Sequence, residues 1–469
     1  MNQSSCDDTH YPLQLLNVLC TNKDNEKFKL LDELNSNVEA FFSSSPPQND
    51  GCSNNDDDGA GEGIAFKVSK QLQILLFSEV QEKYPFSIEN LSRTLQSIKN
   101  LLRWYLQTHS LYAEKELVET LQSLPVLTLY YRALVLTTQQ EWSEAKKDDL
   151  IDVSNVQRFA TLCLLYSSFN SKVGCHYVIT EFPYMKKSTE MLMKTHHTTV
   201  VLATLRLWHS FLVQVPIFKK KFFEYHLDLS QFENASRDPP TNCLAKFQHK
   251  MTTMTTVQLL IHILMWCLQH ENISESDPKV SEVAIEILRI FYVLKAGPQL
   301  DEKLLRELLL TNQDICQVTI LILMDLSPTD LVSLVNLNDN NEKTLFEKVL
   351  LPTMELQVSL VAEQTMVGPI AASTLTPILV VMQKLCEVSK DFRGRTKEMV
   401  LLNTTSQFRK NCLRCLTWTE SHVKRCMGEL LWTLCEESAQ EYKSQVGGIG
   451  NAWPILASRG LVRNVPGSY

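Results

Sequence analysis

The chain has 469 residues, of which 45 are Lys or Arg and 53 are Asp or Glu, and its formal net charge is −8. This acidic balance argues against a nucleic-acid-binding protein, because such proteins usually carry basic stripes. The length allows either about two to four ordinary domains or one elongated array of repeats.

Residues 1–63 precede the long apolar part of the chain. Helical patterning of apolar side chains within residues 1–42 predicts the start of a helical repeat array. Residues 43–63 lack periodicity and are rich in Ser, Pro, Asn, Asp and Gly. Because such a segment buries too little apolar surface to order itself, we expect a disordered acidic loop there.

Glycine is rare in the part of the chain that follows. Residues 64–446 contain only five of the 14 glycines. Hairpins and phosphate-binding loops need glycine, because it readily adopts positive φ. This part of the chain is therefore predicted to be almost entirely helical.

Strongly apolar helical segments recur along residues 64–446, many of them about 40–60 residues apart, which is close to the period of armadillo and HEAT repeats. They are predicted at 72–77, 101–106, 162–169, 202–213, 257–268, 283–294, 318–326, 375–386 and 423–435. We predict an all-α fold in which residues 64–446 form an armadillo/HEAT-like α-solenoid, a right-handed superhelix. Residues 447–469 would be a glycine-rich C-terminal extension. The concave face of a solenoid usually binds another protein chain.

The sequence marks three helix beginnings clearly. Thr376 followed by Pro377 suggests a cap and a first-turn proline. Ser327–Pro328 and Asp277–Pro278 show the same pattern. Helices are therefore predicted to begin at each of these three prolines.

The helix predicted at 423–435 has the clearest amphipathic pattern. Its apolar positions follow the i, i+3, i+4, i+7 spacing of one helix face. They are Val423, Cys426, Met427, Leu430, Leu431, Leu434 and Cys435. A helix with such a stripe must pack against a neighbour, so this segment is predicted to be one layer of a larger array.

Four potential zinc ligands lie close to this helix, at Cys412, Cys415, His422 and Cys426. A zinc-dependent or thiol enzyme is one hypothesis for this group. However, Cys426 lies on the apolar stripe, and the segment between Cys415 and His422 lacks the turn residues that would wrap a metal. Both observations favour buried structural cysteines. With no nucleotide-binding or hydrolase signature elsewhere, we expect no covalent catalysis, no metal and no cofactor.

The chain has 13 cysteines, an odd number, and they are not spaced as in a disulfide framework. The N-terminal residues lack an apolar signal segment. Both features fit a reducing compartment, so we expect the protein in the cytoplasm or at the cell cortex. The runs at 257–268 and 318–326 are shorter than a membrane span, so we expect buried core helices and no membrane insertion. Peripheral recruitment to the plasma membrane stays open.

Several segments together resemble the synembryn family. The strongest is SHVKRCMGELLWTLCEES with the following GGIGNA and ASRGL, and the next is residues 375–401. Weaker similarity occurs at 162–171, 202–218 and 317–335, so that the resemblance is collinear over roughly residues 95–463. One departure is residues 361–373, where the family is usually basic and this chain is not.

The resemblance implies a chaperone and guanine-nucleotide exchange factor for the α subunits of heterotrimeric G proteins (Gα). A monomer with an armadillo-like superhelix would hold nucleotide-free or GDP-bound Gα, with the C-terminal helix of Gα in its concave groove. Releasing that helix from the Gα core would let GDP leave, without any bond being made or broken. The resemblance implies no nucleic-acid partner.

The resemblance also suggests which residues contact the partner. Residues expected in the groove or on the partner-facing side are Arg103, Gln107, Tyr166, Asn170, Arg206, Arg393, Arg395 and Lys397. Gly448, Gly450 and Asn451 match the family's exit motif, which either leads the chain toward the nucleotide-binding core of Gα or caps the last repeat. The alternative function is an armadillo-type protein–protein adaptor without exchange activity.

Overall fold

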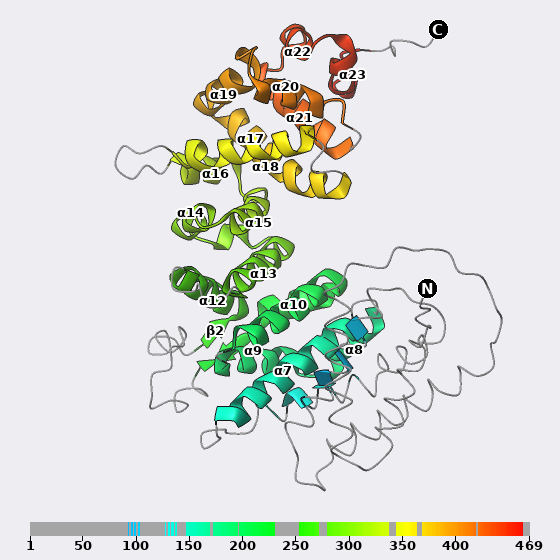
Figure 1. Ribbon diagram of the computed structural model, residues 1–469, viewed down its shortest axis with the longest axis vertical. Helices are drawn as coiled ribbons and strands as arrows, with labels where there is room; N and C mark the ends of the chain where they lie inside the picture. Colours follow the sequence, from blue (N-terminus) through cyan, green and yellow to red (C-terminus); the bar gives the residue numbers. More distant parts are fainter. Residues whose placement is uncertain are drawn as a thin grey trace, which may run out of the picture. The chain divides into compact units, whose positions relative to one another are not determined.

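A computed structural model describes residues 147–168, 172–195, 197–229, 253–271, 279–336, 344–363, 368–418 and 421–462, together with single positions between 92 and 137 (Figure 1). The predictions for residues 1–42, 43–63 and 72–77 lie outside the described residues, as do Gln107 and Asn170. The chain forms two compact units, and α12 (Thr256–Glu271) and α13 (Lys279–Leu294) contribute residues to both.

The first unit contains residues 1–263 and 277–286. Its described helices before α12 are α7 (Lys147–Ser168), α8 (Lys172–Glu181), α9 (Tyr184–Lys194), α10 (Thr198–Gln214) and α11 (Pro216–Glu224).

The second unit contains residues 264–276 and 287–469. After α13 it continues with η5 (Gly297–Gln299), α14 (Glu302–Leu310), α15 (Gln313–Leu323), α16 (Pro328–Asn336), η6 (Phe346–Leu350), α17 (Leu351–Ala362), α18 (Gly368–Val388), α19 (Lys390–Lys397), η7 (Glu398–Leu402), α20 (Gln407–Cys415), α21 (Ser421–Leu434), α22 (Ala439–Gln445) and α23 (Ile449–Ser458).

Helices three positions apart in chain order pack on one another within each unit. In the first unit α10 lies against α7 and, through one ion pair and one side-chain hydrogen bond, against α13. In the second unit α18 lies between α15 and α21, and α17 packs on α20. This is the contact pattern of equivalent helices in successive three-helix repeats. The predicted all-α, armadillo-like architecture is confirmed.

Aromatic rings fill the core beside α10. Trp208 meets Phe222 edge to face at 5.2 Å between ring centroids, and Phe211 meets Phe218 in the same way at 5.4 Å. The indole of Trp208 also donates a 3.0 Å hydrogen bond to the hydroxyl of Ser188 on α9. Large rings with satisfied polar atoms bury much apolar area, so these contacts anchor α10 in the core of the first unit.

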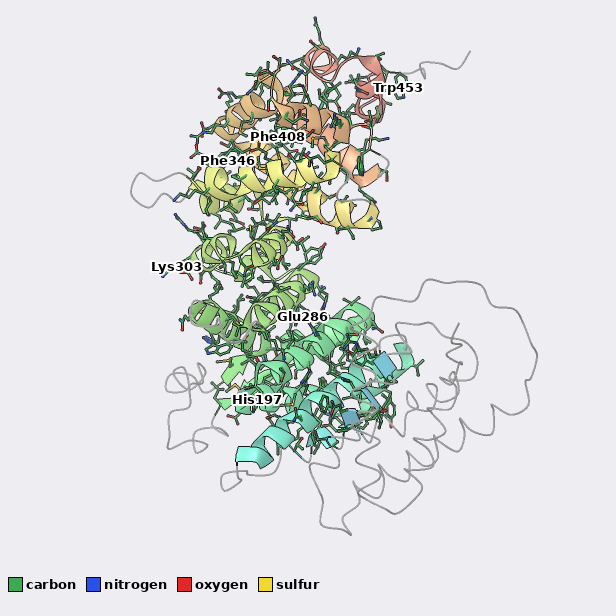
Figure 2. The ribbon with its side chains drawn as sticks, viewed as in Figure 1. His197, Glu286, Lys303, Phe346, Phe408 and Trp453 are labelled. Atoms are coloured by element: carbon green, nitrogen blue, oxygen red, sulfur yellow. The ribbon has the colours of Figure 1, made fainter. Side chains whose placement is uncertain are left out.

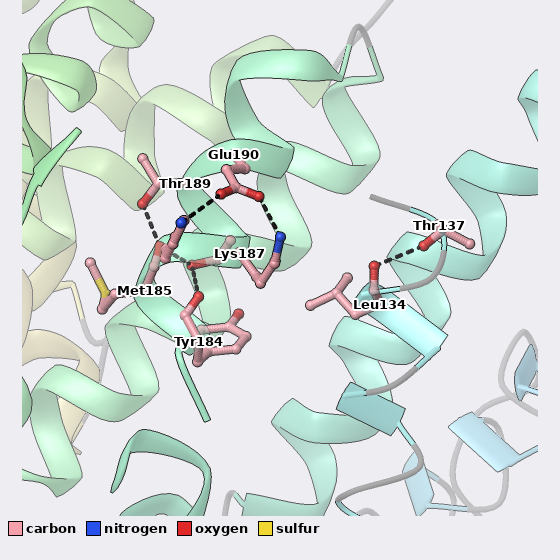
Figure 3. Close-up of polar contacts among 9 residues, drawn as sticks. Leu134, Thr137, Tyr184, Met185, Lys187, Thr189 and Glu190 are labelled. Atoms are coloured by element: carbon pink, nitrogen blue, oxygen red, sulfur yellow. Dashed lines mark hydrogen bonds and ion pairs between the residues drawn. The ribbon is translucent and has the colours of Figure 1, made fainter. Parts of the chain in front are cut away.

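Polar side chains stabilise α9 from within the helix (Figure 3). The buried Glu190 lies 2.7 Å from the ammonium of Lys187 and 4.0 Å from that of Lys186. The hydroxyl of Thr189 donates to the carbonyl oxygen of Met185 at 2.6 Å. A carboxylate with little exposure needs such partners, because an unpaired buried charge is strongly unfavourable.

A short antiparallel hairpin interrupts the helices of the first unit. Strand β1 (His226–Asp228) pairs with β2 (Thr253–Thr255), and Leu227 lies opposite Met254 with both side chains buried. These two strands are a local exception to the predicted, almost entirely helical chain. Alternating buried and exposed residues, with threonines flanking the methionine, favour a strand over a helix there.

Helix α18 begins earlier than the sequence suggested. It starts at Gly368, so Pro377 lies inside the helix and Thr376 is not its cap. Interior proline removes one backbone hydrogen bond. Burial of residues on both sides of the proline, such as Ala371 and Leu379, holds the two halves in one helix. The predicted beginning at Ser327–Pro328 is confirmed, since the Ser327 hydroxyl accepts from the backbone N–H of Asp330 at 3.2 Å.

Among the described residues, α18 is the one helix long and apolar enough to cross a membrane by length and composition alone. Half of its most apolar stretch is buried, and it packs on α15, α16, α17, α19 and α21. Core helices of this kind pass the same test.

The amphipathic stripe predicted for α21 is confirmed at six of its seven positions. These six are fully buried: Val423, Met427, Leu430, Leu431, Leu434 and Cys435. Cys426 is only partly buried. Residues 449–458, within the expected C-terminal extension, form helix α23, which packs on α21 and α22.

Candidate functional site: a basic cluster on α7 and α10

Two aromatic side chains on one face of α7 mark the site, Phe159 and Tyr166. Upstream residues lie against this helix, because the thiol of Cys163 donates to the carbonyl oxygen of Leu95 at 3.5 Å. The ammonium of Lys99 lies 5.5 Å from the centroid of the Phe159 ring. On α7 itself, the guanidinium of Arg158 lies 5.4 Å from the same ring. Both distances are typical of cation–π contacts.

Tyr166 lies among further positive charges. Burial raises the pKa of its phenol, while the charges of Arg103, Arg206 and Arg158 oppose that increase. These three arginines therefore lie close enough to Tyr166 to act on it electrostatically. They come from three segments: the described positions near 103, helix α7 and helix α10.

Two acidic residues of α13 meet the same side of α10. The guanidinium of Arg206 lies 2.8 Å from the carboxylate of Glu282, and both side chains are substantially exposed. About one turn further, Nδ1 of His209 lies 2.7 Å from a carboxylate oxygen of Glu286. The side chain of Glu286, which is labelled in Figure 2, is 4% exposed. The first pair is accessible to solvent, whereas in the second the carboxylate of Glu286 is buried and His209 is partly exposed.

The basic cluster comprises Lys99, Arg103, Arg158 and Arg206, arranged around the aromatic pair. In a chain with net charge −8, such a concentration of cations is a local exception. Guanidinium groups bind carboxylates through two parallel hydrogen bonds, and the ring faces add apolar contact. The arrangement is suited to an acidic or carboxylate-terminated helix, and the cluster residues named above include no nucleophile–base pair.

The structure brings together three of the predicted groove residues, Arg103, Tyr166 and Arg206. Sequence reasoning missed Lys99 and Arg158, although each is a cation beside an apolar helix stripe. It also missed Glu282, which lies 76 residues from Arg206 in the chain and carries no local signal.

The three basic residues of α19 have partners within the second unit. Arg393 donates to the carbonyl oxygens of Cys386 at 2.8 Å and Glu387 at 3.0 Å, at the end of α18. The other two form ion pairs. Arg395 lies 2.6 Å from Glu347 on η6 and 3.1 Å from Asp391, and Lys397 lies 2.8 Å from Glu441 on α22. These side chains hold neighbouring elements together.

The exit motif spans the turn between α22 and α23 and the first residues of α23. Gly448 has φ of 113° and precedes the first residue of α23, a conformation that favours glycine. Asn451 donates from its side-chain amide to the carbonyl oxygen of Val446 at 2.8 Å, which satisfies the end of α22. A side chain at Gly450 would meet no atom within 4 Å. Asn451 therefore satisfies the end of α22, and the expected contact of the motif with a partner stays a prediction.

The cysteines considered as zinc ligands lie in the core. Cys412 and Cys415 are fully buried, and burial raises the pKa of Cys415 to about 12. The pKa of Cys412 is raised well above its ordinary value for the same reason. Within the described residues, no three His, Cys, Asp or Glu side chains converge as a metal site would require.

A family model described as guanine nucleotide exchange factor synembryn matches residues 73–468. The chain belongs to the synembryn family. The match includes the segments that form the basic cluster as well as the turn before α23.

Synembryn relatives with curated names are similar over shorter stretches. Chaperone Ric-8A of Gallus gallus is 31% identical over 98 residues, which is 19% of this chain and 18% of the relative. Chaperone Ric-8A of Xenopus tropicalis is 27% identical over 119 residues, 24% of this chain and 22% of the relative. The matched stretches thus span about a fifth of the length of these relatives.

One solved structure aligns over nearly its whole length, and its description concerns a phosphorylation switch in the interaction between cadherin and β-catenin. It covers 95% of this synembryn chain and 96% of its own, with 10% identity and a TM-score of 0.33. That similarity is too low to bear on the function.

Proposed function

We propose that this protein is a guanine-nucleotide exchange factor and folding chaperone for Gα subunits. The observation that carries the proposal is the basic cluster around Phe159 and Tyr166, in a chain of the synembryn family. The proposed ligand of the cluster is the C-terminal helix of Gα, which ends in a free carboxylate. Arg103 and Arg206 would bind carboxylates, and the aromatic face would accept the apolar side of the helix.

The exchange step follows from preferential binding. A Gα subunit whose C-terminal helix has left its core holds GDP weakly, so a protein that binds the released helix favours the nucleotide-free state. GTP then enters the empty site and reverses the equilibrium. The side chains of the cluster need only bind; no bond is made or broken.

The chaperone activity would use the same binding site. A newly made Gα subunit passes through a nucleotide-free state before it first binds nucleotide, and that state is prone to unfold. Because a protein that binds one state stabilises it by mass action, the same contacts would protect the new subunit.

GDP release from purified Gα subunits, with and without this protein, tests the proposal. We expect faster release and, after nucleotide removal, a stable one-to-one complex that dissociates when GTP is added. Binding of the C-terminal Gα helix without faster release would instead favour the adaptor function. The absence of both faster release and complex formation, across all Gα classes, would contradict the proposal.

We also propose that the protein acts as a monomer in the cytoplasm, where Gα subunits are made, with transient recruitment to the inner face of the plasma membrane. Sedimentation velocity of the purified protein and fractionation of cells test these two statements. A stable dimer, or a predominantly membrane-embedded fraction, would contradict them.

A further inference from the structure

Arg206 takes part in two interactions at once. Its guanidinium lies 2.8 Å from the carboxylate of Glu282, with 44% and 49% of the two side chains exposed. The same guanidinium contributes to the positive charge around Tyr166. Since Glu282 is in the first turn of α13, the N-terminal end of that helix adds to its stability as an anion. An internal carboxylate therefore already occupies part of the basic cluster.

The neighbouring pair differs in its surroundings. His209 and Glu286 repeat the α10–α13 contact at 2.7 Å, but only 4% of the Glu286 side chain is exposed. Removing the partner of a buried carboxylate carries a large energetic penalty, whereas an exposed pair exchanges its partners readily. The contact to the buried Glu286 carboxylate can therefore keep α13 on α10 while the exposed pair opens.

We propose that Glu282 is an exchangeable internal counter-ion, which occupies the guanidinium of Arg206 until a ligand carboxylate replaces Glu282. The His209–Glu286 pair would keep α13 in place during this exchange. This inference rests on the proposed function, because it names a residue that sets which acidic helices the basic cluster accepts. A weakly acidic helix would not displace Glu282. A ligand that presents a carboxylate in the right position would displace Glu282 and bind the guanidinium of Arg206.

The substitution Glu282→Gln tests the inference, with Glu224→Gln as the matched control. Glu224 also forms an exposed ion pair in the first unit, 3.7 Å from Lys220, so both variants lose one negative charge and one ion pair. Affinity would be measured by fluorescence anisotropy with a labelled peptide of the Gα C-terminal helix, with a free carboxylate. We expect Glu282→Gln to bind about two- to fivefold more tightly than the wild type, as expected for loss of one exposed competing pair. Glu224→Gln should bind like the wild type.

A second measurement does not depend on Gα. Phenylglyoxal modifies accessible arginines, and peptide mass spectrometry would give the rate at Arg206. We expect faster modification of Arg206 in Glu282→Gln and no change in Glu224→Gln. In an Arg206→Gln background, Glu282→Gln should no longer increase peptide affinity.

The outcomes separate this inference from the proposed function. If the wild type binds no peptide, the proposed function fails, and the modification rate of Arg206 still decides whether Glu282 withholds it. An unchanged modification rate would overturn the inference. Unchanged or weaker peptide binding by Glu282→Gln, with normal binding by the wild type, would also overturn it and leave the proposed function standing.

Discussion

Arg393 donates a 2.8 Å hydrogen bond from Nε to the carbonyl oxygen of Cys386, and so satisfies the C-terminal end of α18. A second bond from the same guanidinium reaches the carbonyl oxygen of Glu387 at 3.0 Å. The last carbonyls of a helix have no partners within the helix, so a cation placed there satisfies them and interacts favourably with the helix dipole. The first role of Arg393 is therefore structural.

Replacing Arg393 with Gln tests this role. The variant loses charge-assisted hydrogen bonds to backbone carbonyls at a partly exposed position, so we expect the free energy of unfolding to fall by about 1–2 kcal/mol. Urea denaturation followed by circular dichroism measures it. Lys410→Gln on α20, an exposed cation, is the control and should change stability by less than about 0.5 kcal/mol. Equal stability of the Arg393 variant and the wild type would show that these bonds contribute nothing.

Close packing of Gly428 against α23 gives a second prediction. A Cβ at Gly428 would lie 2.8 Å from Cγ1 of Ile455 and 2.9 Å from its Cδ1, whereas a Cβ at Gly394 on α19 would meet nothing within 4 Å. We expect Gly428→Val to destabilise the second unit by about 1–3 kcal/mol through overpacking. The matched variant Gly394→Val should be neutral or slightly stabilising, since valine favours helix over glycine.

Hydrogen exchange of residues 449–458 would locate the effect. We expect protection in α23 to fall in Gly428→Val and to stay unchanged in Gly394→Val. If both variants lose protection equally, the contact between α21 and α23 does not depend on the glycine.

The amide of Asn451 supports a third prediction. Its hydrogen bond to the carbonyl oxygen of Val446 joins the start of α23 to the end of α22. Asn451→Ala should therefore lower stability by about 0.5–1.5 kcal/mol, the usual net contribution of one hydrogen bond. The same variant should leave peptide binding at the basic cluster unchanged. A selective loss of GDP-release activity, with stability intact, would instead favour a direct contact of this turn with Gα.

The buried thiols predict how stability depends on pH. Burial raises the pKa of Cys415 and Cys435 to about 12 and that of Cys386 to about 11, compared with an ordinary value near 9.0. In the folded state these thiols keep their protons at a pH where the unfolded chain has already lost them. Stability is therefore expected to fall as pH rises from about 9 toward 12, under reducing conditions.

Thiol labelling at pH 8 gives the corresponding test. Cys412 and Cys415 should react with a thiol reagent only on unfolding, because the thiolate is the reactive form and both side chains are buried. Rapid labelling of both in the folded protein would contradict the core assignment and revive the thiol-site hypothesis.

Local sequence patterns predicted much of the helical architecture. The stripe of α21 has the 3.6-residue period of one helix face, and six of its seven side chains are buried as expected. The beginning of α18 was mispredicted, because Thr376 and Pro377 carry a helix-start signal that tertiary packing overrides. The local helix propensity of a residue predicts little where buried residues on both sides of a proline hold a helix together.

The candidate site was harder to predict than the fold. Helix periodicity placed Tyr166 and Arg206 on helices, but ion-pair partners are set by the packing of distant segments. Arg395 and Glu347 are 48 residues apart, and no pattern in either segment points to the other. Consequently, the sequence could not distinguish the cations that surround Tyr166 from those that hold α19 in place.

The most direct test of the central claim is the rate of GDP release from Gα with a charge-reversed basic cluster. In the double variant Arg103→Glu, Arg158→Glu, we expect exchange to be at least about tenfold slower than with the wild type, because the cluster would repel the carboxylate of the Gα helix. Lys303→Glu on α14 (Figure 2), an exposed cation of the second unit, is the control and should exchange normally. Wild-type exchange rates from a correctly folded double variant would contradict the proposal that this cluster binds Gα.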